Sequence, residues 1–179
     1  MLRYRLSFLV VICVVFAWGT VQVMAGETNS TTVAVSIAPS IAVVAWPEGF
    51  LIMDTDVVPG QEVMSSVLEI SVKANSSWGI QISGDSPDGR MREFDLGTGS
   101  YVSSGALLTH PLQWALYPSE SWQALSSTPS SIVAGQPPTD NNGETVRFRL
   151  RFVADYGDRP LEEGRDYRVT LQYTAGLNF

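Results

Sequence analysis

Cysteine and histidine are almost missing from this sequence. Its 179 residues include one cysteine, Cys13, and one histidine, His110. Cys13 lies in an apolar run near the N-terminus, and no other residue carries a thiol. Disulfide bonds, thiolate metal sites and cysteine nucleophiles are therefore excluded for residues 14–179, and a domain there depends on its hydrophobic core. About 150 residues can build such a core.

Basic residues are also few. The chain has 11 lysines and arginines against 18 acidic residues, a formal net charge of −7, and Lys73 is its only lysine. Nucleic acids are bound through clustered lysine and arginine side chains, and this chain has its arginines dispersed. We therefore expect no nucleic-acid partner. An acidic surface is expected to keep the protein soluble.

The first 25 residues have the pattern of a cleavable signal peptide. Arg3 and Arg5 precede the apolar run of residues 6–18, and the segment ends in the small residue Ala25. The apolar run is shorter than the roughly 20 residues that a membrane-spanning helix needs. We predict an exported chain that is secreted, surface-located or periplasmic, with no membrane contact after cleavage. Residues 26–30 are predicted to be a flexible N-terminus.

Hydrophobic residues alternate with polar ones along most of the remaining chain. A period of two residues is typical of β-strands, and no segment after the signal peptide has a convincing helical period. Strands are predicted at residues 31–37, 41–46, 63–74, 78–83, 111–117, 131–134, 144–154 and 166–175, with weaker extended pieces at 91–96 and 101–102. Stretches rich in proline, glycine, serine and asparagine separate them.

Seven or eight short strands joined by turn-rich loops predict an all-β fold. The expected architecture is a two-sheet antiparallel β-sandwich of the immunoglobulin-like kind, formed by residues 31–179 as a single domain. Trp78, Ile80 and Ile82 should face the core, as should Val146 and Phe148.

Two segments carry a family resemblance. An Asn-x-x-Trp turn opens the strand NSSWGIQIS, residues 75–83, and GRDYRVTLQYTAG, residues 164–176, has the form Gly-x-x-Tyr-x-Val-Thr. They resemble secreted prokaryotic immunoglobulin-like surface domains of the adhesin and pilus-subunit kind. Trp78-Gly79-Ile80 also has a faint likeness to WxL cell-wall-binding domains, although the second tryptophan motif of that family is absent. The resemblance implies the sandwich fold more than an activity.

The residues that would support catalysis are not in catalytic patterns. His110 precedes Pro111 without a Gly-x-Ser-x-Gly elbow, so a serine triad is not indicated. Glu162 and Glu163 are sequence neighbours in a turn, whereas glycoside hydrolysis needs two carboxylates facing each other across a cleft. We therefore expect that the protein is not an enzyme.

Two binding sites remain as hypotheses. Trp122, in the polar context PSESWQALSS, is expected to be exposed and is a candidate for stacking on a sugar ring. Asp140, Asn142 and Glu144 offer closely spaced oxygen ligands around a glycine and are candidates for Ca²⁺, the only cofactor considered. Aspartate and asparagine are also the residues that tight turns prefer, and the turn interpretation is favoured.

The N-terminal strand suggests assembly. Val33, Val35 and Ile37 alternate with small or polar residues, as in a segment that completes the sheet of a neighbouring molecule. The same residues also suit the first strand of their own domain, which we favour.

The leading functional hypothesis is a non-enzymatic secreted or cell-surface structural module that mediates adhesion or assembly, with itself or with other surface proteins. A carbohydrate-binding module that recognises glycans through Trp122 is the alternative. A small outer-membrane β-barrel is the third hypothesis, because the chain ends in Phe179 after an alternating strand.

Overall fold

Antiparallel β-strands make up the regular structure of the described residues. The computed structural model describes residues 32–53 and 56–179, so the predicted signal peptide (1–25) and flexible N-terminus (26–30) lie outside the described residues. Ile37–Phe179 form one compact unit. Its strands are β1 (Ile41–Ala45), β2 (Glu62–Met64), β3 (Leu68–Ala74), β4 (Trp78–Gly84), β5 (Arg92–Asp95), β6 (Ser100–Tyr101), β7 (Gln113–Leu116), β8 (Gln123–Ala124), β9 (Ser130–Gln136), β10 (Glu144–Val153), β11 (Arg165–Arg168) and β12 (Leu171–Leu177). Among the described residues, no helix is long and apolar enough to cross a lipid bilayer.

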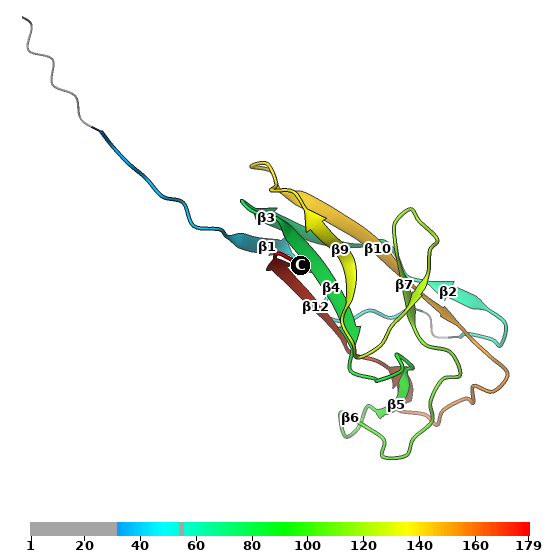
Figure 1. Ribbon diagram of the computed structural model, residues 1–179. Helices are drawn as coiled ribbons and strands as arrows, with labels where there is room; N and C mark the ends of the chain where they lie inside the picture. The colour runs from blue at the N-terminus through cyan, green and yellow to red at the C-terminus, as the bar shows by residue number, and fades with distance from the viewer. Residues whose placement is uncertain (1–31, 54–55) are drawn as a thin grey trace, which may run out of the picture. The chain divides into compact units, whose positions relative to one another are not determined.

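The strands form three sheets. The largest has the order β1-β3-β10-β7-β8, with β2 also paired to β10, and the second has the order β12-β4-β9. A small third sheet, β11-β5-β6, lies at one end of the unit, beyond the ends of β4 and β12 (Figure 1). Every pairing is antiparallel.

The hydrophobic core lies between the two larger sheets. Alternate residues of β3 and β10 are buried, as period-two patterning requires, while in β4, the central strand of its sheet, every residue but Gln81 is buried. Across the interface, the ring of Phe148 on β10 lies 5.6 Å from that of Tyr173 on β12, measured between centroids. Trp78 is fully buried and its Nε1–H donates a 2.8 Å hydrogen bond to the carbonyl oxygen of Pro137. The all-β, antiparallel fold predicted from the sequence is confirmed, and the arrangement is consistent with a β-sandwich.

The structure has more strands than the predicted seven or eight. The weaker pieces at 91–96 and 101–102 form β5 and β6, β8 was not predicted, and two predicted runs are interrupted. Residues 63–74 divide into β2 and β3, which pair with consecutive parts of β10. Between them, Ser65 exchanges hydrogen bonds with Leu150, its N–H donating to the carbonyl oxygen and its Oγ accepting from the N–H. The run 166–175 divides into β11 and β12, which belong to different sheets. Asp85 holds this crossing point, accepting a 3.0 Å hydrogen bond from the N–H of Thr170 at Oδ1.

The first strand begins later than predicted. Residues 32–40 form no strand, so the expectation that 31–37 is the first strand of its own domain is wrong for the part of that run that the structure describes. The side chain of Asn75 fixes the backbone just before β1. It accepts a 2.7 Å hydrogen bond from the N–H of Ser40 and donates a 2.9 Å bond to the carbonyl oxygen of Ala38. The alternating run is therefore followed by a fixed connection into β1.

Candidate functional site

Trp122 lies just before β8 and is half-buried rather than exposed as expected. The guanidinium carbon of Arg151 on β10 lies 4.5 Å from the centroid of its ring, in cation–π geometry. Arg151 is itself positioned by a 2.9 Å hydrogen bond from Nε to Oε1 of Gln113. The guanidinium of Arg151 therefore covers part of the Trp122 ring, which reduces the ring surface open to a sugar. Glycan binding at Trp122 stays a prediction.

Asp140, Asn142 and Glu144 lie in the loop that leads into β10. Oδ1 of Asp140 accepts hydrogen bonds from the N–H groups of Asn142 (2.8 Å) and Gly143 (3.1 Å). Gly143 has a φ of +84°, a conformation that glycine adopts without strain. The loop is thus an aspartate-stabilised turn. In the described part of the chain, no three or more histidine, cysteine, aspartate or glutamate side chains gather so that they could hold a metal ion. Calcium binding stays a prediction.

The alternating segment offers apolar side chains to solvent. Val33 and Val35 are each 82% exposed, and Ile37 is 80% exposed. Ala34 and Ser36, on the opposite side of the alternation, are exposed as well. The apolar side chains of this segment are therefore unburied, which leaves its predicted role in assembly as a prediction.

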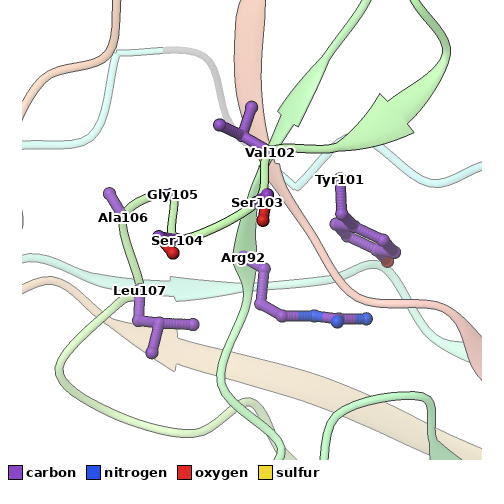
Figure 2. A pocket seen from close by; sticks show the side chains of 8 residues that line it. All are labelled: Arg92, Tyr101, Val102, Ser103, Ser104, Gly105, Ala106 and Leu107. Atoms are coloured by element: carbon purple, nitrogen blue, oxygen red, sulfur yellow. The ribbon is translucent and has the colours of Figure 1, made fainter.

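A shallow pocket lies beside the small third sheet (Figure 2). It has a volume of about 370 Å³ and is lined by Arg92, Tyr101 and residues 102–107. The guanidinium of Arg92 extends over the ring of Tyr101, 3.9 Å from its centroid, while Leu107 forms the opposite wall. Asp85 accepts a 3.0 Å hydrogen bond from Arg92, so the charge in the pocket is already neutralised. No motif in the sequence predicted this pocket.

Glu93 holds the pocket loop in place. Its carboxylate is 2% exposed and accepts hydrogen bonds from the N–H of Ala106 (2.7 Å), from Arg165 (2.5 Å) and from Arg159 (3.3 Å). The bond from Ala106 and then the bond from Arg165 hold the pKa of Glu93 below its ordinary value. The carboxylate is therefore ionised and paired at neutral pH, which fits a structural role better than an acid–base one.

His110, for which no serine triad is indicated, lies beside Asp155 at the surface. Its Nε2 lies 3.4 Å from Oδ2 of Asp155, and both side chains are about half exposed. The N–H of Gly157, and then His110, hold the pKa of Asp155 below its ordinary value. Glu162 lies 3.6 Å from Arg165 and serves as one more of its carboxylate partners.

Exposed apolar side chains are concentrated toward one part of the sequence. Most of the large hydrophobic residues with high exposure lie between residues 33 and 64: Val33, Val35, Ile37, Val44, Trp46, Phe50, Ile52, Val58 and Met64. The connection from β1 to β2, residues 46–61, contributes four of them. Two of these four also contact their own chain: the ring of Trp46 stacks on that of Tyr173, with centroids 6.4 Å apart, and the guanidinium carbon of Arg168 lies 4.9 Å from the centroid of the Phe50 ring. Exposed apolar side chains that lie together mark surfaces that contact another molecule.

Comparison of the chain with protein-family models gave no match, and comparison with curated protein sequences gave none either.

Proposed function

We propose that this protein is a non-enzymatic structural module of the cell exterior, whose sheets and connections mediate adhesion or assembly. The proposal includes export through the N-terminal signal peptide and the immunoglobulin-like character of the sandwich. The observation that carries it is the exposure of four large apolar side chains along the β1–β2 connection: Trp46, Phe50, Ile52 and Val58. A partner that covered these side chains would remove their apolar area from water, which favours binding.

The ionisable groups support the same proposal. Arginine and carboxylate side chains neutralise each other at the strands of the small sheet, as in the set formed by Glu93, Arg159 and Arg165. Such pairs hold loops and fix the register of strands. Exposed apolar side chains on the β1–β2 connection, together with charges that are already paired, favour contact with a partner over turnover of a substrate.

The proposal is tested on producing cells. We compare the wild-type chain with the double variant Ile52→Ser/Val58→Ser and with the control Tyr156→Ser, whose side chain is 89% exposed outside this region. The wild type and the control should be accessible to protease on intact cells and stay with them on washing, and the double variant should be released. Retention of the chain inside the cell, or equal retention of all three chains, would contradict the proposal.

A further inference from the structure

The strand β12 is an edge without the usual protection against pairing. It runs for seven residues, Leu171–Leu177, ends its sheet, and contains no charged residue and no proline. The other edge strands of the described residues are blunted: β2, β6 and β8 have two or three residues, β11 is charged, and β1 and β9 have irregular registers. Natural proteins use these devices to prevent strand addition.

The inward face of β12 is also incompletely covered. Tyr173, Ala175 and Leu177 pair with buried residues of β4 and so face the core, yet each of them is only half-buried. On the opposite sheet, Ile41 and Val43 of β1 are half-buried as well. We call these five residues the open seam. One more strand beside β12 would bury the seam and pair the backbone of the edge.

We propose that residues 33–37 of a second copy of this chain add to β12 as that strand, with Val33, Val35 and Ile37 covering the open seam. The proposal rests on the proposed function and names its partner. The added segment has the period of two residues that a strand requires, carries no charge, and exposes more than three quarters of each apolar side chain.

The same molecule is a poor donor for its own edge. Only residues 38–40 separate the segment from β1, and Asn75 holds Ala38 and Ser40 there. Pro39 restricts Ala38 to extended conformations, and residues 32–40 contain no glycine, asparagine or aspartate for a tight reversal. Every copy has one segment and one edge, so the contact is head-to-tail and propagates from copy to copy.

The test compares charged substitutions on the two faces of the segment. The triple variant Val33→Asp/Val35→Asp/Ile37→Asp changes the face that should cover the seam, and Thr32→Asp/Ala34→Asp/Ser36→Asp places the same charge on the other face. Sedimentation velocity of the wild type should show oligomers that grow with concentration. The first variant should need at least about 100-fold higher concentration to associate, and the second should stay within about tenfold of the wild type.

The edge is tested separately. Ala175→Lys places a charge in the open seam, and Thr174→Lys is its control on the outer face, where Thr174 is exposed. Ala175→Lys alone should be monomeric, but mixing it with the Val33→Asp/Val35→Asp/Ile37→Asp variant should give a one-to-one dimer, because one copy keeps its segment and the other its edge. A labelled peptide of residues 31–38, TTVAVSIA, should bind the triple variant even if Ala175→Lys does not fold.

Equal loss of association in both aspartate variants would overturn the inference. So would a wild type that stays monomeric together with a peptide that does not bind. Neither result would change how much of the chain stays on cells in the test with the Ile52→Ser/Val58→Ser variant. Failure of this inference is therefore distinguishable from failure of the proposed function.

Discussion

Replacing Gly176 by alanine is expected to release the ring of Phe179 from the outer face of β12. Gly176 and Gly79 are directly paired across β12 and β4, and the chain turns back so that Phe179 lies over both. A methyl group on Gly176 would lie 2.6 Å from Cζ of Phe179, and the next two nearest atoms belong to the same ring. Because this ring is the end of a mobile side chain, it should swing away rather than distort the strand.

The size of the effect follows from the exposure of Phe179. Complete burial of a phenylalanine side chain stabilises a protein by roughly 1.5–3 kcal/mol, and Phe179 remains 40% exposed. Release of the ring should therefore cost about 1–2 kcal/mol. Alanine restricts the unfolded chain more than glycine does and returns about 0.4–1 kcal/mol. We expect a net loss of about 0.5–1 kcal/mol, or roughly 2–3 °C in Tm.

In the Phe179→Ala background, the effect of Gly176→Ala on stability should have the opposite sign. In Phe179→Ala the ring is already gone, so Gly176→Ala should stabilise that variant by about 0.4–1 kcal/mol. Urea unfolding of the four chains in the double-mutant cycle measures both values. Destabilisation of similar size in both backgrounds would refute the reasoning, since it would show that alanine at this position meets something other than the ring of Phe179.

Three further outcomes are expected from the described side chains. The pKa of Glu93 is below its ordinary value of 4.5, so its ion pairs stabilise the protein above that pH. The difference in Tm between wild type and Glu93→Gln should be largest near pH 7 and should shrink as the pH falls below 4.5. Trp122→Ala should lower any affinity found in a glycan-binding screen, and unchanged binding would remove this tryptophan from the site. Asp140→Ala should destabilise the turn before β10 by about 0.5–1.5 kcal/mol, and Tm should be the same with calcium or with chelator if Asp140 serves only the turn.

The core could be predicted from the sequence because its strands carry period-two patterns strong enough to set their faces. Trp78, Ile80 and Ile82 face the core as expected, and so do Val146 and Phe148. The interruptions were not predictable in the same way. Residues 166–175 alternate without a break, and the change of sheet coincides with tertiary contacts of Thr170, whose N–H donates to Oδ1 of Asp85 and whose carbonyl oxygen accepts from the N–H of Asp85.

The pocket, and the role of Glu93 in holding its loop, could not be predicted for a related reason. Glu93 lies between Arg92 and Phe94 in a weak extended stretch, where a glutamate is normally a solvated residue. Its burial depends on Arg159 and Arg165, which are distant in sequence. Alternation indicates which side chains face the core, but it does not indicate which distant arginines neutralise a carboxylate, so the role of Glu93 could not be predicted.

The response to salt separates strand addition from other modes of self-association. Each copy carries a formal net charge of −7, so copies repel one another, and the repulsion acts over about 30 Å at 0.01 M salt but only about 8 Å at 0.15 M. Residues 33–37 and β12 are uncharged, so their contact contains no ion pair that salt would weaken. Self-association should therefore strengthen as salt is raised across this range, as measured by sedimentation. An interface between copies that is held by arginine–carboxylate ion pairs would weaken instead, and that result would contradict a contact at β12.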